Sequence, residues 1–127
     1  MTDTKGVHAT MKLVDSEIKV MEVLWQEGDC TAKRIAQVLH EAIGWNVNTT
    51  YTLIKRCIGK GAIERSEPNF LCRALVSREE VQQQQTQELI DKVYGGSVDK
   101  LFAALLGGKG VTREQLDRLR AMIDEME

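Results

Sequence analysis

The chain has 127 residues, of which 43% are hydrophobic and 28% are charged, with one proline and ten glycines. This suits a globular protein of one domain, or of one small domain plus an appendage, and excludes collagen-like or proline-rich chains. The longest apolar run, Leu101 to Leu106, is too short to span a membrane, and the N-terminus lacks the apolar core of a signal peptide. The three separated cysteines argue against a disulfide framework, so we expect a cytoplasmic protein without membrane insertion.

The net charge of -2 conceals an asymmetry along the chain. Residues 1–76 hold ten Lys and Arg against nine Asp and Glu, whereas residues 77–127 hold seven against ten. Between Trp45 and Arg73 there are five basic residues and two acidic ones. A local basic segment is the usual electrostatic signature of nucleic-acid binding, although on charge alone a solvated surface is the simpler explanation.

In chain order, the first prediction is a flexible arm over residues 1–10, which lack periodicity. Amphipathic patterns then predict three helices, over about 15–26, from an N-cap at Thr31 to about 43, and over about 48–60. A glycine follows each helix, and a short extended link joins the first two. Next comes a β-hairpin, with strands over 62–65 and 70–75 and a turn between them.

The second half of the chain is predicted to be helical throughout. Ser77 to Glu80 and Thr112 to Gln115 are capping boxes that open helices, and Ser97 caps a short helix between them. Three helices and a hairpin are the elements of a winged helix. We therefore predict a mainly α fold with a small β-hairpin wing, in which a winged helix-turn-helix DNA-binding domain (11–76) precedes a helical dimerisation domain (77–127).

The third predicted helix is the candidate DNA reader. Leu53, Ile54, Cys57 and Ile58 turn inward, and the opposite face carries no carboxylate. Residues at the start of a recognition helix usually reach base edges, and later basic residues hold phosphates. The side chains assigned to bases are Asn48, Thr49, Tyr51 and Thr52, those assigned to phosphates are Lys55 and Arg56, and the further candidates are Asn46, Arg65, Asn69 and Arg73.

Simpler roles remain open for several of these residues. Asn46 or Asn48 would serve equally well as a helix cap, and the threonines as exposed helix residues. Trp45 fits a core or hinge position better than a DNA contact, since tryptophan usually buries a large area. Charge and motif therefore indicate DNA binding without excluding a purely structural surface.

The combined spacing resembles the penicillinase-repressor family, the BlaI/MecI/CopY-type winged-helix repressors. The resemblance covers about residues 11–125. It is carried by four segments, 13–25, 45–61, 77–80 and 91–96, which are similar to the family's opening helix, recognition helix, linking helix and the junction before its dimerising helices.

This resemblance implies a homodimer that represses promoters by binding an inverted-repeat double-stranded operator. In the β-lactam branch, a membrane-bound sensor peptidase triggers cleavage of the repressor, which by position corresponds to the Ala104–Leu105 bond. The repressors of that branch have Asn-Phe at this bond. At the first helix, Val14 stands where the family often has Ser or Thr, so we expect Asp15 to cap that helix instead. The paired CxC cysteines of the copper branch are absent after Cys72.

The last two predicted helices present two apolar stripes on a segment too short to bury both. Pairing with a second copy would remove these stripes from water at roughly 25 cal/mol per Å². The candidate dimerisation residues are Val93, Leu101, Phe102, Leu105, Leu116, Leu119 and Ile123.

Three alternative classes are a protein-binding module, a metal-responsive repressor and an enzyme. A winged helix can bind protein instead of DNA, and cysteines from two subunits would give a metal-responsive repressor without a CxC cluster. An enzyme would have to use Cys30, Cys57 or Cys72 with one of two histidines, and none has a partner at a motif spacing. We therefore expect neither an enzyme nor a bound cofactor or metal.

Overall fold

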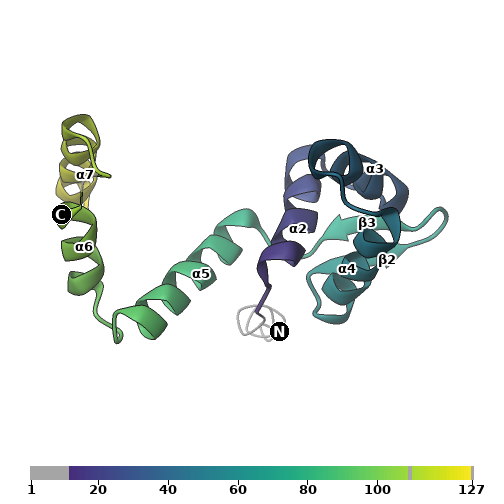
Figure 1. The fold of residues 1–127 in the computed structure, drawn as a ribbon, viewed down its shortest axis with the longest axis horizontal. Helices are drawn as coiled ribbons and strands as arrows, with labels where there is room; N and C mark the ends of the chain where they lie inside the picture. Colours follow the sequence, from purple (N-terminus) through teal and green to yellow (C-terminus); the bar gives the residue numbers. More distant parts are fainter. Residues whose placement is uncertain (1–11, 109, 127) are drawn as a thin grey trace. The chain divides into compact units, whose positions relative to one another are not determined.

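The computed structural model describes residues 12–108 and 110–126 (Figure 1). Its elements are α2 (Asp15–Glu27), β1 (Cys30–Thr31), α3 (Ala32–Ile43), α4 (Val47–Gly59), β2 (Ile63–Ser66), β3 (Leu71–Ala74), α5 (Arg78–Val93), α6 (Val98–Gly107) and α7 (Arg113–Glu125). They form two compact units that divide within α5, between Gln84 and Gln85. The predicted fold class is confirmed: the protein is mainly helical, and its small sheet and first three helices make a winged helix. The predicted arm over 1–10 lies outside the described residues.

In the first unit, α2, α3 and α4 pack around one apolar core. Their buried faces repeat at helical spacing because every third or fourth residue is apolar. Val20, Met21, Ile35 and Ile54 are all fully enclosed. Burial of this size stabilises each side chain by about 1.5–3 kcal/mol, so the core fixes how α4 lies against its neighbours.

The segment that joins β3 to α5 contacts α2. The Trp25 indole N–H donates to the backbone oxygen of Val76 at 3.0 Å, and the Arg78 guanidinium lies 5.6 Å from the centre of the same ring. Val81, in the first turn of α5, belongs to the same apolar core. The start of α5 is therefore part of the winged-helix unit.

The sheet has three antiparallel strands in the order β1-β3-β2. The predicted hairpin is present as β2 and β3, with Ile63 opposite Ala74 and Ser66 opposite Leu71. The segment expected to be only an extended link contributes β1, which pairs with β3. The pairing joins residues about forty positions apart, which no local pattern can reveal.

Most helix ends agree with the sequence. Thr31, Ser97 and Thr112 each accept a hydrogen bond from a backbone N–H of the first turn, as predicted. The predicted Asp15 cap is wrong, because α2 begins after Val14, which has no polar side chain. The Glu17 carboxylate accepts from the Val14 N–H at 2.9 Å instead and satisfies one donor of that helix end.

The second unit contains the rest of α5 together with α6 and α7. Neither α6 nor α7 has a buried residue, and Ile90 is the one buried hydrophobic side chain among the described residues after Gln84. This unit therefore holds its helices together with very little core of its own.

Candidate nucleic-acid interface

Helix α4 separates a buried face from an exposed polar one. Leu53, Ile54 and Cys57 are buried, as the periodicity predicted, and Ile58 is half-buried. Thr50 is buried with them. The opposite face carries no acidic residue along the whole helix. The exposed side chains on it are Asn48, Thr49, Thr52, Lys55 and Arg56.

Two of the candidate DNA-binding residues also hold the backbone of α4. The Asn46 side chain caps the helix, accepting from the Asn48 N–H at 2.7 Å, so its oxygen is engaged and its amide N–H₂ is the group left to face outward. The Thr52 hydroxyl donates to the Asn48 backbone oxygen at 3.0 Å. Asn46 therefore caps the helix, and α4 begins at Val47, one residue before the predicted start at Asn48.

The turn between α3 and α4 fixes the direction in which α4 leaves. Gly44 adopts a left-handed conformation with φ 74°, which a residue with a Cβ rarely tolerates. Its N–H donates to the His40 backbone oxygen at 2.9 Å, and a His40 ring nitrogen lies 3.0 Å from the Trp45 oxygen. Trp45 is half-buried against the core, in line with its expected core or hinge position.

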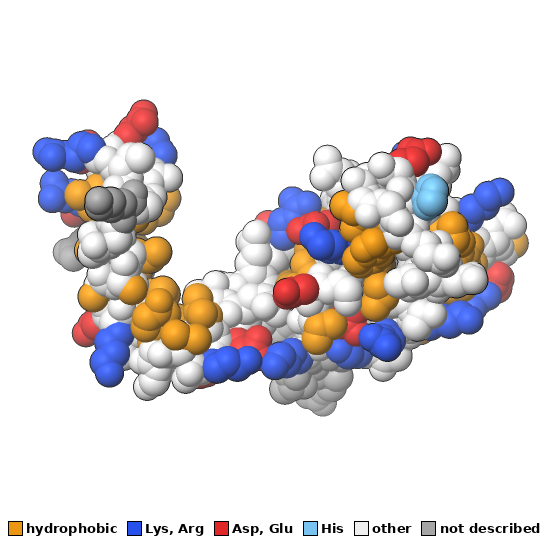
Figure 2. Space-filling model, in the orientation of Figure 1, with side chains coloured by type: hydrophobic (Ala, Val, Ile, Leu, Met, Phe, Trp, Pro, Cys, Tyr) orange, Lys and Arg blue, Asp and Glu red, His pale blue; other side chains and the backbone are white. Residues whose placement is uncertain are grey.

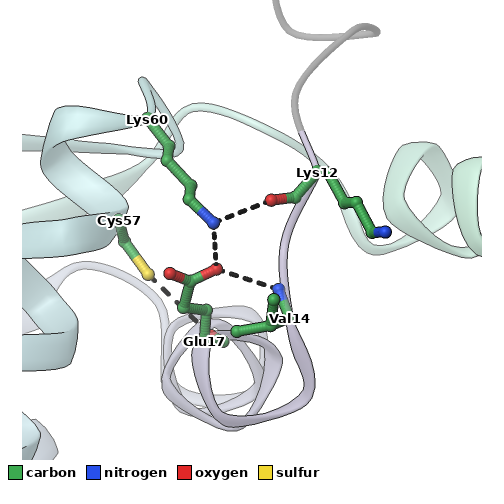
Figure 3. Close-up of polar contacts among 5 residues, drawn as sticks. All are labelled: Lys12, Val14, Glu17, Cys57 and Lys60. Atoms are coloured by element: carbon green, nitrogen blue, oxygen red, sulfur yellow. Dashed lines mark hydrogen bonds and ion pairs between the residues drawn. The ribbon is translucent and has the colours of Figure 1, made fainter.

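The far end of α4 is tied to α2 through a buried carboxylate (Figure 3). Glu17 is 1% exposed and accepts from the Lys60 ammonium at 2.7 Å. The same ammonium donates to the Lys12 backbone oxygen at 2.8 Å. Lys60 therefore holds α4 in place. This role was not predictable, because Glu17 looks like any acidic residue in a first helical turn.

The basic residues of α4 and those of the wing differ in their partners. Among the described residues, no ion pair involves Lys55 or Arg56. Arg65 and Arg73 both lie in ion pairs, with Glu67 and Glu64 respectively, each at 2.6 Å.

These ion pairs shift the pKa values of two wing residues. The Arg65 guanidinium, followed by the Phe70 N–H, lowers the pKa of Glu67, and the hydrogen bond to Glu64 raises the pKa of Arg73. The wing is thus nearly neutral at its own surface, while α4 presents free positive charge.

The turn of the wing has a strained backbone. Asn69 and Phe70 both have positive φ, at 70° and 55°. Asn69 tolerates this conformation, but Phe70 does so at a cost of order 1–3 kcal/mol. Phe70 therefore lies in the turn and not in the returning strand, which begins at Leu71.

Contacts of the Phe70 ring offset that cost. Its centre is 5.9 Å from the Tyr51 ring of α4 in an edge-to-face arrangement, and the Arg65 guanidinium lies 3.6 Å from it. Tyr51, assigned to bases from the sequence, is half-buried in this contact. The wing and α4 are thereby joined into one surface.

The cysteines lack the signature of a catalytic nucleophile. Burial raises the pKa of Cys57 to about 12 and of Cys72 to about 11, and the pKa of Cys30 is raised as well. A catalytic thiol needs the opposite shift, because the thiolate is the nucleophile. Within the described part of the chain, no cluster of three metal-ligating side chains occurs.

Hydrophobic side chains are exposed on the second unit (Figure 2). Val93 is 60% exposed, Phe102 43%, Leu105 46% and Ile123 58%. Leu101, Leu116 and Leu119 are half-buried. The residues predicted to form an interface between copies are therefore uncovered or partly covered in the single chain.

A family model described as penicillinase repressor matches residues 13–125. The chain is 25% identical over 118 residues to the methicillin resistance regulatory protein MecI of Staphylococcus aureus strain N315, covering 91% of this chain and 96% of that one. It is 19% identical over 116 residues to the penicillinase repressor of Bacillus licheniformis, covering 90% and 91%. No helix in the described residues has the length and apolar character needed to cross a membrane.

Proposed function

The chain belongs to the penicillinase repressor family, and from this membership we propose that it represses transcription by binding an inverted-repeat operator in double-stranded DNA as a homodimer. The observation that carries the proposal is the exposed face of α4, which is free of acidic residues and bears two cations that form no ion pair with any residue the structure describes. Such a face suits the major groove, where phosphates flank the base edges. The repressor would act in the cytoplasm, on a promoter.

Within α4, the start of the helix reads bases and its second half holds phosphates. Asn48 and Thr49 are exposed at the first turn, where a recognition helix meets base edges. Thr52 has its hydroxyl proton committed to the backbone, so it offers a lone pair and a methyl group to the groove. Lys55 and Arg56 then neutralise phosphates, and neither has to give up a carboxylate partner within the described part of the chain.

The wing contributes less to binding than its charge suggests. Arg65 and Arg73 would have to exchange a carboxylate for a phosphate, which returns little net free energy at an exposed site. Asn69, exposed in the turn, is free of that penalty. Tyr51 serves mainly to hold the wing against α4 through Phe70.

The second unit supplies the dimer. Its exposed apolar side chains on α6 and α7 lack a core to pack into, and a second copy offers the same surface in return. Two recognition helices linked in this way bind two half-sites together, so the affinity of the pair exceeds that of either alone. Any loss of the dimer therefore releases the operator.

We propose that the inducing signal also acts on the second unit. Ala104 and Leu105 are exposed in the second half of α6, so cutting their bond would divide the proposed interface. A membrane sensor peptidase would act on this bond only indirectly, through a protease that accepts Ala-Leu in place of Asn-Phe. A metal-responsive repressor is the alternative, and it would require ligands contributed by two subunits.

The test is selection of bound sequences from random duplex DNA by the full chain at two salt concentrations. We expect an inverted repeat to be enriched, with an affinity that falls steeply as salt rises, because phosphate contacts release counterions. The matched control is the same selection with Lys55→Ala/Arg56→Ala. Absence of enrichment by the unmodified chain at either salt would refute the proposal and favour a winged helix that binds protein.

A further inference from the structure

Two of the three cysteines lie opposite each other on neighbouring strands of the sheet. Cys30 in β1 is directly opposite Cys72 in β3 in the antiparallel register. Opposed residues of such strands have Cα atoms about 4.5–5.5 Å apart and side chains on the same face. Protein disulfides span Cα separations of about 4.4–6.8 Å. The register therefore places the two residues at a Cα separation that a disulfide can span, and both thiols are free.

From this register we propose that Cys30 and Cys72 are a thiol modification site: a dithiol that closes to an intramolecular disulfide by exchange with a low-molecular-weight disulfide. The Cys30 thiolate attacks the small disulfide, forms a mixed disulfide and displaces one small thiolate. The Cys72 thiolate then attacks the Cys30 sulfur and displaces the second. Two protein thiols are oxidised, one small disulfide is reduced to two thiols, and the two protons pass to the leaving thiolates.

The order of the two steps follows from burial. Cys30 is half-buried and is the thiol that an external disulfide can reach, whereas Cys72 is fully enclosed and has Cys30 as its strand partner. Cys57 lies in the core on α4, with its sulfur 3.9 Å from the Glu17 backbone oxygen. It has no place in the strand register, so it serves as an internal control.

The reaction should be slow at neutral pH and faster in mild alkali. Burial is the main cause that raises the pKa of both thiols, so the thiolate that attacks is scarce. The rate should rise about tenfold per pH unit over pH 7 to 9, since it follows the thiolate fraction. The charged groups that act on the pair are Glu27, Asp29 and Arg34 near Cys30 and Arg65 near Cys72.

Closing this bond would constrain the candidate interface itself. The loop between the two cysteines contains α3, α4 and β2. A cross-link that closes such a loop removes conformational freedom mainly from the unfolded chain. The oxidised protein should therefore melt at a higher temperature than the reduced one, by at least about 5 °C.

The experiment treats the native full chain with oxidised glutathione, blocks remaining thiols with an alkylating agent and maps the peptides by mass spectrometry. We expect a Cys30–Cys72 cross-link in the unmodified chain and in Cys57→Ala, none in Cys30→Ser, and reversal of the melting shift by dithiothreitol. The Cys30→Ser variant replaces a half-buried thiol at the edge of the core with a hydroxyl and leaves every fully buried side chain unchanged. A glutathione adduct that persists on Cys30, pairing through Cys57, a cross-link between chains, or three unreacted thiols would overturn the proposal.

Discussion

Arg56 is the residue for which the structure makes the sharpest prediction. It is exposed on α4 and makes no ion pair with any described residue. Replacing it with Ala should weaken binding to every duplex sequence by on the order of tenfold, because a charged hydrogen bond to phosphate is lost. The slope of log affinity against log salt should also fall by about one per chain. Titrations of operator and random duplexes at several salt concentrations measure both effects.

The control for this prediction is Arg120→Ala, which removes the same charge from an exposed position on α7. If long-range electrostatics alone caused the effect, the two variants would lose similar amounts of affinity for DNA. If Arg56→Ala bound as tightly as the unmodified chain, and with the same salt slope, α4 would not lie along the phosphate backbone.

Single residues also mark the limit of what the sequence can tell. The exposure of Lys55 and Arg56 follows from helical periodicity, so it was predictable. The partners of Arg65 and Arg73 were not, because they depend on which residues the turn and the β2–β3 register bring together. The burial of Glu17 was equally hidden, since it depends on the approach of Lys60 from forty-three positions away.

At the scale of elements, the wing offers a test of how closely it approaches DNA. Glu64→Gln removes the carboxylate that holds Arg73 at 2.6 and 2.9 Å and keeps the shape of the side chain. If Arg73 faces the duplex, the released guanidinium should strengthen DNA binding by about threefold and make the salt dependence steeper. Fluorescence anisotropy with a labelled operator measures the change.

The matched variant for the wing is Glu22→Gln, which makes the same change in net charge at an exposed position of α2. A gain in Glu64→Gln beyond that in Glu22→Gln locates the effect in the wing. Equal gains in the two variants would mean that Arg73 stays away from the duplex and that only net charge matters.

The ends of the helices were predictable to within about two residues, whereas the strands of the sheet were predicted less completely. Helix starts are encoded locally, as in the Thr112 and Gln115 capping box, whose two hydrogen bonds measure 2.9 and 3.1 Å. A two-residue strand such as β1 has no period to detect, and its partner lies across the whole helix-turn-helix. The left-handed Phe70 was missed for a related reason: contacts with Tyr51 and Arg65 override its own preference.

For the whole molecule, the proposal requires that two chains pair through the second unit. Leu105 is 46% exposed on α6, within the apolar stripe of that helix. In the dimer, Leu105→Asp would place a carboxylate against apolar surface, where an unpaired charge costs several kcal/mol. We expect the variant to be monomeric at micromolar concentration by sedimentation equilibrium, with its helix content unchanged.

The same variant connects assembly to operator binding. A monomer retains α4 and the wing, so Leu105→Asp should bind a single half-site as the unmodified chain does and lose at least about a hundredfold on the full inverted repeat, where avidity disappears. Ala103→Asp is the control, because helical periodicity places Ala103 on the other side of α6 from the apolar stripe. A monomeric Leu105→Asp with undiminished affinity for the full repeat would separate operator binding from dimerisation, and an unmodified chain that is itself monomeric would remove the basis for an inverted-repeat operator.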